Sequence, residues 1–447
     1  MMIKKTGIIC CFLFVLACKK NGNDAPPPPG GDPNGGGNPP PANTALTITS
    51  VSPDSTENGP ITITGTGFNT TANLNGVQFG SYSATVKSAT TTQLVVDLPA
   101  NLPQGDHDVI VVANNKTVTL VKGFHLIGWE VTHFAGTGAT GSNDGPVATA
   151  TFRQPTGLAV DAAGNLYVPD LHKIRKITPQ GLVSTIAGGE GRGSTDGNGT
   201  AARFNFVSSI VLDAAGNMYV ADQMNFTIRK ITPGGDVTTI AGLAGEFGYA
   251  DGVGDKARFS APYGLAIDAT NSHLYVGDTG NDRIRKIELA TGTVTTIAGN
   301  GEGASVDGVG LQAGIPSPGS MAFDKDGVLY ITEKGGGRVR RMMPDGTVTT
   351  VGGYLSVNDG PTHLVADDNR NIYVTFSGLG KVKKYSPAGV ETNFAGNNIG
   401  TGEEDGPAQA IFFKRPEGIV IVKDSEGNLI FYIADSVNKK IKKIIRR

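Results

Sequence analysis

The sequence predicts an all-β fold, in which a small β-sandwich precedes a closed ring of six four-stranded sheets. One residue pattern occurs six times between Pro155 and Ile444. Residues 46–127 show a different, alternating apolar and polar pattern. The 447 residues also include 64 Gly and 25 Pro, and this many turn formers beside Val, Ile and Thr favours short strands over helices. Because a fixed repeat period determines the architecture, the repeats are the primary signal.

The N-terminus has the features of an export signal. Lys4 and Lys5 precede an apolar run over residues 8–17, which is too short to span a bilayer as a helix but fits a secretory signal. The run ends in Val-Leu-Ala before Cys18, and this resembles the signal of bacterial lipoproteins. The resemblance implies that Cys18 becomes the first residue and carries the lipid. An ordinary cleaved signal peptide is the alternative interpretation of residues 1–18.

Residues 19–45 are rich in Pro and Gly and contain almost nothing to bury, so we expect a solvated tether. With the lipid on Cys18, the chain is expected to be exported and anchored to the outer membrane or cell surface. The formal net charge of −2 gives no general attraction to nucleic acid. The three cysteines lie at positions 10, 11 and 18, so the rest of the chain can hold neither a disulfide nor a cysteine-ligated zinc.

Residues 46–127 predict a small sandwich, because short alternating strands are separated by turn signals such as Asn75-Gly76. The Ser-Pro at 52–53, the Gly-Thr-Gly-Phe at 65–68 and the Val-Gln-Phe-Gly at 77–80 resemble the IPT/TIG family of immunoglobulin-like domains. The resemblance implies a spacer or interaction module without catalytic residues. Asp106-His107-Asp108 is interpreted as a solvated turn and not as a metal site.

Each later repeat contains four short β segments, which in the first are residues 158–160, 166–168, 173–177 and 183–187. Four strands per repeat are typical of a β-propeller. The repeats resemble the NHL family over about residues 131–444. The pattern begins at Pro155, Val207, Pro262, Pro318, Pro361 and Pro416, in steps of 52, 55, 56, 43 and 55 residues by subtraction.

The sixth repeat lacks a fourth strand after Ile444. Residues 131–136 match the fourth-strand pattern of residues 237–242 but precede the first repeat. An unpaired edge would leave backbone donors and acceptors open. We therefore predict that residues 131–135 form the outermost strand of the last blade, so that residues 129–447 make a closed six-bladed propeller.

Two recurrent features are expected to be structural. A tyrosine in the second strand of every blade is expected to pack between blades. A basic pair in the third strand is expected to cover apolar sheet and to form ion pairs with acidic residues that close the preceding strand, and binding of an acidic polysaccharide is the alternative. The tyrosines are Tyr167, Tyr219, Tyr275, Tyr330, Tyr373 and Tyr432. The basic pairs are Arg175-Lys176, Arg229-Lys230, Arg285-Lys286, Arg340-Arg341, Lys383-Lys384 and Lys442-Lys443.

Ligands are expected at the loops that join successive blades, because these loops vary most in length. They carry Asp-Gly pairs that are interpreted as turns; calcium at Asp251 to Asp255 is a weaker alternative, since the ligand set is incomplete. The loop at 354–360 is shortened. The ligand-binding candidates on this rim are Phe226, Phe247, Tyr249, Tyr263, Tyr354, His172 and His363.

No nucleophile elbow, phosphate loop or complete zinc ligand set occurs, so we predict no catalytic residues, no metal and no cofactor. The predicted function is non-catalytic binding of a glycan or protein partner at the propeller face, as an accessory to glycan uptake. The alternative is a propeller lyase or hydrolase acting on an extracellular substrate, with His172 and His363 as its candidate residues.

Overall fold

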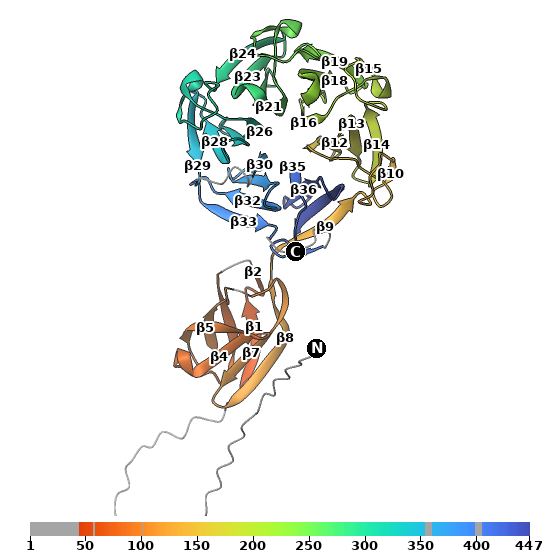
Figure 1. Cartoon of the computed structure of the whole chain (residues 1–447). Helices are drawn as coiled ribbons and strands as arrows, with labels where there is room; N and C mark the ends of the chain where they lie inside the picture. The colour runs from red at the N-terminus through yellow and green to blue at the C-terminus, as the bar shows by residue number, and fades with distance from the viewer. Residues whose placement is uncertain (1–43, 57–58, 101, 354–359, 398–404) are drawn as a thin grey trace, which may run out of the picture.

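A computed structural model describes residues 44–56, 59–100, 102–353, 360–397 and 405–447. Cys18 and nearly all of the proposed tether lie outside these residues, as does Tyr354. The described chain is all-β and contains a sandwich and a six-bladed propeller, as predicted (Figure 1).

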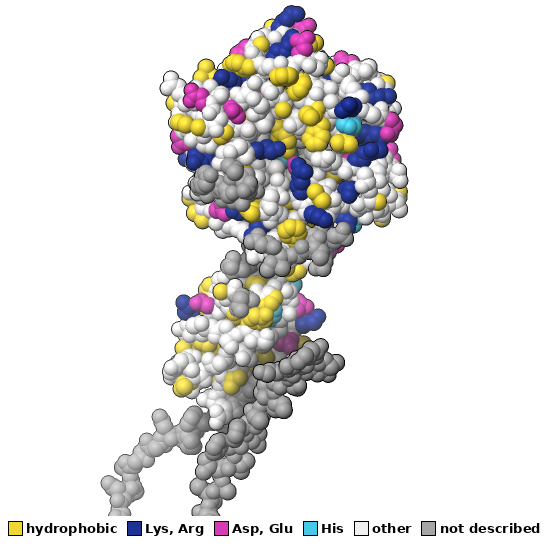
Figure 2. Space-filling model, viewed as in Figure 1, with side chains coloured by type: hydrophobic (Ala, Val, Ile, Leu, Met, Phe, Trp, Pro, Cys, Tyr) yellow, Lys and Arg dark blue, Asp and Glu magenta, His cyan; other side chains and the backbone are white. Residues whose placement is uncertain are grey.

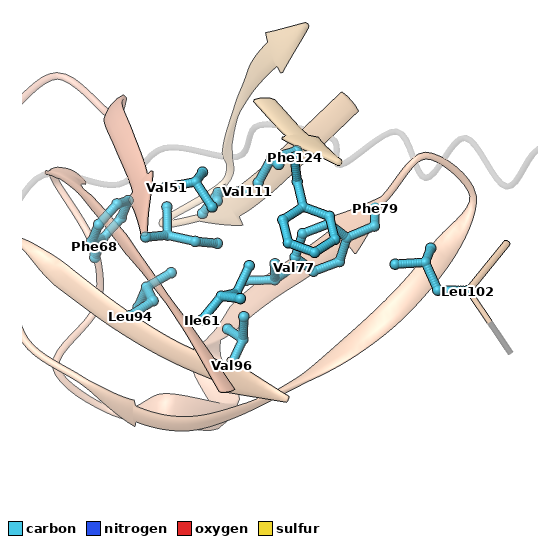
Figure 3. Close-up of a cluster of buried hydrophobic side chains, with 12 residues drawn as sticks. Val51, Ile61, Phe68, Val77, Phe79, Leu94, Val96, Leu102, Val111 and Phe124 are labelled. Atoms are coloured by element: carbon cyan, nitrogen blue, oxygen red, sulfur yellow. The ribbon is translucent and has the colours of Figure 1, made fainter. Parts of the chain in front are cut away.

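The sandwich is a continuous sheet in the order β1-β3-β6-β5-β4-β7-β8-β2, folded over an apolar core. Alternate side chains of β3 and β6 point inward, and Phe79 meets Phe124 edge to face at 5.1 Å (Figure 3). The strands are β1 (Thr47–Ser52), β2 (Ser55–Thr56), β3 (Pro60–Thr66), β4 (Asn75–Phe79), β5 (Tyr82–Ala89), β6 (Gln93–Asp97), β7 (Gly105–Ala113) and β8 (Lys116–Leu126), with a 3-10 turn η1 (Ala72–Leu74).

The first three blades are antiparallel sheets in which the inner strand lines the central channel. Blade 1 contains β10 (Gly145–Pro146), β11 (Ala159–Val160), β12 (Leu166–Asp170), β13 (Lys173–Ile177) and β14 (Leu182–Ala187). Blade 2 contains β15 (Gly197–Asn198), β16 (Val207–Leu212), β17 (Met218–Asp222), β18 (Thr227–Ile231) and β19 (Asp236–Ala241). Blade 3 contains β20 (Gly252–Val253), β21 (Pro262–Ile267), β22 (His273–Asp278), β23 (Arg283–Glu288) and β24 (Thr293–Ala298).

The other three blades follow the same plan. Blade 4 contains β25 (Gly308–Val309), β26 (Pro318–Phe323), β27 (Leu329–Glu333), β28 (Arg338–Met342) and β29 (Thr347–Val351). Blade 5 contains β30 (Pro361–Ala366), β31 (Ile372–Phe376), β32 (Lys381–Tyr385) and β33 (Glu391–Ala395). Blade 6 contains β34 (Gly406–Pro407), β35 (Pro416–Lys423), β36 (Leu429–Asp435), β37 (Lys440–Arg446) and β9 (Trp129–Ala135). Short 3-10 turns are η2 (Gly199–Ala201), η3 (Gln223–Asn225), η4 (Gly254–Lys256), η5 (Thr279–Asn281) and η6 (Gly310–Gln312).

The ring closes through residues 131–135 as predicted, but these residues are not the outermost strand of blade 6, because β34 pairs outside them. β9 precedes blade 1 in the chain but pairs antiparallel with β37, with Val131 opposite Ile444 and Trp129 opposite Arg446. Both Val131 and Ile444 are fully buried in the core shared by blades 5 and 6. The backbone amides of Gly128 and Arg447 each donate to the other's carbonyl, at 2.8 and 2.9 Å.

The prediction of four strands per blade was incomplete. In five of the blades, two residues of the preceding loop add a fifth strand to the outer edge, as Gly145 does opposite Val183. A two-residue strand has no periodicity to detect, and its Asp-Gly was interpreted as an exposed turn. Blade 5, which follows the shortened loop, has four strands among the described residues.

A belt of side-chain hydroxyls joins each of the first five blades to the inner strand of the next blade. The donors lie on or just before the inner strand in blades 1 and 2, in η5 in blade 3, and on the second strands β27 and β31 in blades 4 and 5. Each donates to a carbonyl of the next inner strand: Thr156 to Val207 (2.8 Å), Ser208 to Tyr263 (2.9 Å), Thr279 to Pro318 (2.6 Å), Thr332 to Thr362 (3.0 Å) and Thr375 to Glu417 (2.7 Å). The Gly418 amide completes the circuit by donating to the Thr156 carbonyl at 2.6 Å. These bonds hold the channel walls in register, because buried polar groups need partners.

Candidate functional site

In blades 1 to 4, the first member of the basic pair is an arginine buried between two acidic side chains. Arg285 donates to Asp278 at the end of β22 and to Asp251 in the preceding loop, both at 2.7 Å. Its guanidinium also donates to the carbonyls of Arg258 and Ala250 and lies 5.1 Å from the Phe259 ring. The predicted ion pairs are therefore confirmed for this arginine, which is fully buried and holds a loop to the sheet.

The same arrangement recurs around the ring. The equivalent triads are Asp144–Arg175–Asp170, Asp196–Arg229–Asp222, and Asp307–Arg340–Glu333. In blade 6, Lys442 donates to Asp405 at 2.9 Å. In blade 5, where Phe376 replaces the strand-end acid, Lys383 instead bonds to Glu391 at 2.6 Å and lies over the Phe376 ring.

These contacts also account for the Asp-Gly loops. The Asp251 carboxylate accepts from Arg285 and from both the amide and hydroxyl of Thr296. Burial raises its pKa, but the Thr296 and Arg285 bonds outweigh burial and hold the pKa below its usual value. Asp251 is thus engaged in the fold, and no group of three or more potential metal ligands occurs among the described residues.

The tyrosines of the second strands pack between blades, as predicted, and each lies in or against a core shared with the next blade. Tyr167 illustrates a second role, because its hydroxyl donates to Asp161 in the turn after the inner strand at 3.0 Å. Burial first, and then Asp161, raises the pKa of Tyr167 to about 12. The second member of its basic pair is Lys176, which lies 5.8 Å from the ring centre.

Three predicted rim aromatics form an exposed cluster at blades 2 and 3, which we call the aromatic rim. Phe247 is 72% exposed and Tyr249 is 50% exposed, and both belong to the loop that precedes blade 3. The half-buried Phe226 follows η3 in blade 2 and lies 5.7 Å from Phe247, centre to centre. Arg283 lies 4.4 Å from the Tyr249 ring centre. Hydrophobic and basic side chains also gather on the ring face seen in Figure 2.

Two other candidates were placed wrongly on the rim. Tyr263 is 4% exposed and His363 is 5% exposed, and both lie on inner strands that face the channel. Their rings are 5.5 Å apart. Both residues follow directly after an interblade loop. The sequence alone does not show whether the end of that loop lies on the rim or inside the channel.

Tyr263 belongs to a charged cluster in the channel. Its hydroxyl donates to Glu417 Oε2 of β35 at 2.8 Å, and Arg415 Nε donates to Glu417 Oε1 at 2.9 Å. Lys334 Nζ lies 3.8 Å from the Tyr263 ring centre. Burial lowers the pKa of Lys334, and Glu417 opposes this shift.

His363 is the residue of this charged cluster whose hydrogen-bonding atoms have the fewest partners among the described residues. Its Nδ1 lies 4.0 Å from Glu417 Oε2, and neither ring nitrogen makes a hydrogen bond among the described residues. Burial lowers the pKa of His363 to about 4; Glu417 and the nearby Ser208 backbone oppose the shift, and Lys334 adds to it. The imidazole is therefore neutral at pH 7.

His172 has a different position, in the turn between β12 and β13. Its Nδ1 accepts from the Phe206 backbone amide at 3.1 Å, so a neutral ring carries its proton on Nε2. Burial lowers the pKa of His172, and Arg153 and Arg192 lower it further. His172 positions the loop before blade 2, and the interactions found among the described residues do not join it to His363.

Residues 46–125 match the IPT/TIG domain family. The match covers nearly all of the β-sandwich. No helix in the described part of the chain has both the length and the apolar character needed to cross a bilayer.

Two curated relatives are similar to part of this chain. NHL repeat-containing protein 2 of Bos taurus is 32% identical over 200 residues, covering 41% of this chain and 27% of that protein. Teneurin-3 of Mus musculus is 30% identical over 184 residues, covering 37% of this chain and 6% of that protein. The chain therefore aligns with about a quarter or less of these relatives' lengths.

A solved structure extends the likeness to both domains. An auxiliary nutrient binding protein from Bacteroides ovatus is 17% identical and superposes with a TM-score of 0.55, covering 90% of this chain and 98% of that one. At this identity the likeness concerns the fold. Together, the comparisons support a TIG domain followed by an NHL-type propeller.

Proposed function

We propose that this chain is a lipid-anchored surface protein whose propeller binds a glycan without catalysis, as an accessory to nutrient uptake. The aromatic rim carries the proposal, because Phe247 and Tyr249 expose large ring faces on a loop that is clamped to the sheet through Asp251 and Arg285. Aromatic faces suit the apolar faces of sugar rings, and a held loop loses little entropy on binding. The fold of the nutrient binding protein adds support by analogy.

The binding test uses the chain without residues 1–18 on an array of neutral and acidic polysaccharides. The double variant Phe247→Ala, Tyr249→Ala is expected to lose at least tenfold in affinity for any glycan that binds. Val253→Ala is the matched control, since Val253 is 54% exposed and lies in the same loop. Absence of any carbohydrate binding would favour a protein partner, and equal binding by the double variant would move the site elsewhere.

Anchoring is a separate part of the proposal. Cys18→Ala is expected to abolish incorporation of a radiolabelled fatty acid and to release the protein from the membrane fraction, because one thiol carries the lipid. Cys11→Ala leaves the signal's final cysteine intact and is the control. Full labelling of Cys18→Ala would contradict the lipoprotein interpretation.

The enzyme alternative requires His172 and His363 to act on one substrate. His172 is held by the Phe206 backbone, while His363 faces the channel. Metal analysis of the purified protein, with His172→Ala and His363→Ala, tests this alternative. A bound metal that either substitution removes, or an activity that both abolish, would support an enzyme.

A further inference from the structure

A cavity lies where the sandwich meets blades 5 and 6. Its volume is about 600 Å³, which is within the range of roughly 300–1,000 Å³ that is usual for small-molecule sites. One wall comes from the sandwich and its linker, at Leu102, Gln104 and residues 126–128, and the facing wall comes from turns and strand ends of the two blades. Figure 1 shows β33 and β9 at the edge of the ring nearest the sandwich. The turns follow the inner strands, which begin at the interblade loops, so the cavity and the aromatic rim are separate sites.

Blade 6 is longer than the other blades at this cavity. Its strands β37 and β9 each contain seven residues, whereas the third and fourth strands of the other blades contain five or six. The last additional pair is Trp129 opposite Arg446, and both residues line the cavity. The Gln104 side-chain amide, with its nitrogen toward the Trp129 carbonyl, makes two hydrogen bonds with the Trp129 backbone, at 3.0 and 3.2 Å. The junction between the two domains is therefore built around Trp129.

Trp129 also supplies an aromatic surface to the cavity. The residue is only partly buried, although its ring packs edge to face with Phe394 and Phe431. Its indole N–H makes no hydrogen bond in the described part of the chain and remains accessible. A fixed aromatic ring with an open donor suits a sugar, because the ring packs against C–H groups while the N–H meets a hydroxyl.

Side-chain amides supply most of the polar groups, since six of the residues that line the cavity are Asn or Gln. In the turn after the inner strand of blade 5, Asn371 Nδ2 donates to Asp367 at 2.8 Å. In the same turn of blade 6, Asn428 Nδ2 donates to Asp424 at 3.1 Å. These bonds fix the two amides and leave their Oδ1 atoms as acceptors. Sugar hydroxyls, which both donate and accept, match such a wall.

Asn369 distinguishes the blade 5 turn from its equivalents. Its backbone amide donates to the turn aspartate at 2.9 Å, as do the amides of the corresponding Ala163 and Ala215 at 3.0 Å. Its side chain is exposed and makes no hydrogen bond among the described residues. The turn therefore forms without this side chain, which leaves both its donor and its acceptor for a ligand.

The charged groups of the cavity are few. Asp367 accepts four hydrogen bonds, three from its own turn and one from the Tyr373 hydroxyl, so it has little capacity left for a ligand. Lys384 Nζ lies 5.7 Å from the Tyr373 ring centre, and Arg446 makes contacts of its own. With six amides beside these three charged side chains, the wall favours uncharged hydroxyls over a charged group.

We propose that this cavity binds a short neutral oligosaccharide, with sugar hydroxyls bonded to Asn369, Asn371 and the Trp129 indole. Both domains contact the ligand, so the sandwich takes part in binding as well as serving as a spacer. The proposal shares its ligand class with the proposed function but adds a second site that uses no residue of the aromatic rim. Either site can therefore fail while the other stands.

The test titrates the chain without residues 1–18 with maltotriose, cellotriose, xylotriose and mannotriose, and with trigalacturonic acid as the acidic probe. Trp129 is the sole tryptophan, so its fluorescence reports on this cavity. At least one neutral trisaccharide is expected to change the emission in a saturable way and to protect the indole from quenching by acrylamide. Asn369→Ala should weaken this binding about tenfold, which corresponds to about 1.4 kcal/mol. Asp326→Ala, at the same turn position in blade 4 and outside the cavity, is the control.

The double variant Phe247→Ala, Tyr249→Ala separates the two sites. An emission change that persists in this variant supports the cavity. Sugar binding that leaves the Trp129 emission unchanged would overturn the cavity proposal and leave the aromatic rim standing. No emission change with any neutral trisaccharide, or equal affinity of Asn369→Ala and wild type, would also overturn it. Tighter binding of trigalacturonic acid would overturn the neutral class and indicate that Lys384 and Arg446 select an acidic sugar.

Discussion

The Tyr263 hydroxyl donates a 2.8 Å hydrogen bond to the Glu417 carboxylate across the channel, from blade 3 to blade 6. The two residues are 154 positions apart in the chain and lie on opposite sides of the ring. Both are almost completely buried. This bond therefore braces the ring across its diameter, in addition to the belt of hydroxyls that runs around it.

Tyr263→Phe is expected to lower the free energy of unfolding by about 1–3 kcal/mol, because a buried charge-assisted bond is lost. Urea denaturation measures this change. Tyr167→Phe is the matched control: its hydroxyl also binds a carboxylate, but the residue is only half-buried, so the loss should be smaller. Equal losses of unfolding free energy in the two variants would show that the bond across the channel stabilises the fold no more than the bond of the half-buried Tyr167 does.

Arg285→Met is expected to destabilise the fold by about 3–5 kcal/mol, because Asp278 and Asp251 would lose their shared cation. Lys286→Met, at the neighbouring position, should cost much less. In the Arg285→Met background, Asp251→Asn should add little, since the contact is already broken. If urea denaturation shows that the two substitutions lower the unfolding free energy additively, then Arg285 and Asp251 do not act together to hold the loop to the sheet.

Stability should depend on pH through His363. Its pKa is lowered from 6.5 to about 4 in the folded state by burial, with Glu417 and Lys334 as the charged groups nearby. Below pH 6.5 the unfolded chain takes up a proton that the folded chain does not, so stability present at pH 7 is lost as pH falls. The loss reaches about 3 kcal/mol at pH 4.

His363→Gln should remove that part of the pH dependence while leaving the contributions of the carboxylates. The measurement is the difference between wild-type and variant unfolding free energies at pH 7, 5.5 and 4. A constant difference across this range would contradict the assignment of the lowered pKa to His363.

Closure of the ring can be tested by a disulfide. Thr132 and Lys443 are directly paired across β9 and β37. In a chain without residues 1–18, Thr132→Cys with Lys443→Cys is expected to raise stability by about 2–4 kcal/mol when oxidised. Denaturation of the same variant with and without a reductant supplies the control, and identical curves would mean that the two strands do not hold the ring closed.

The closure, the number of blades and the role of the tyrosines could be predicted because each depends on a repeated pattern. The strand at 131–135 was recognisable by matching the fourth strands, and Tyr167 with its equivalents lay at one position of every second strand. Periodicity reports which face a side chain takes, and the packing of a sheet core follows from that.

Less of the candidate site could be predicted from the sequence. The ion pair between Asp251 and Arg285 joins positions 34 apart in the chain. Neither residue alone shows whether the Asp-Gly forms an exposed turn or ties the loop to the sheet. A signal existed in the repeats, because blade 5 lacks both the long loop and the strand-end acid, and there Lys383 bonds to Glu391. His363 was visible as the one large residue at a position where the other inner strands have Gly or Ser, but its lack of partners is a property of the folded channel.

The position of β9 has a mechanical consequence. If the chain is anchored through Cys18 and the propeller holds a ligand, traction passes along β8 through Gly128 and enters the ring at β9, where closure depends on pairing and not on a peptide bond. The first pair to bear the load is Gly128 with Arg447. Trp129 packs beside it against Phe394 and Phe431, at 5.0 and 5.5 Å. This aromatic contact reinforces the ring at the point where it would otherwise begin to peel.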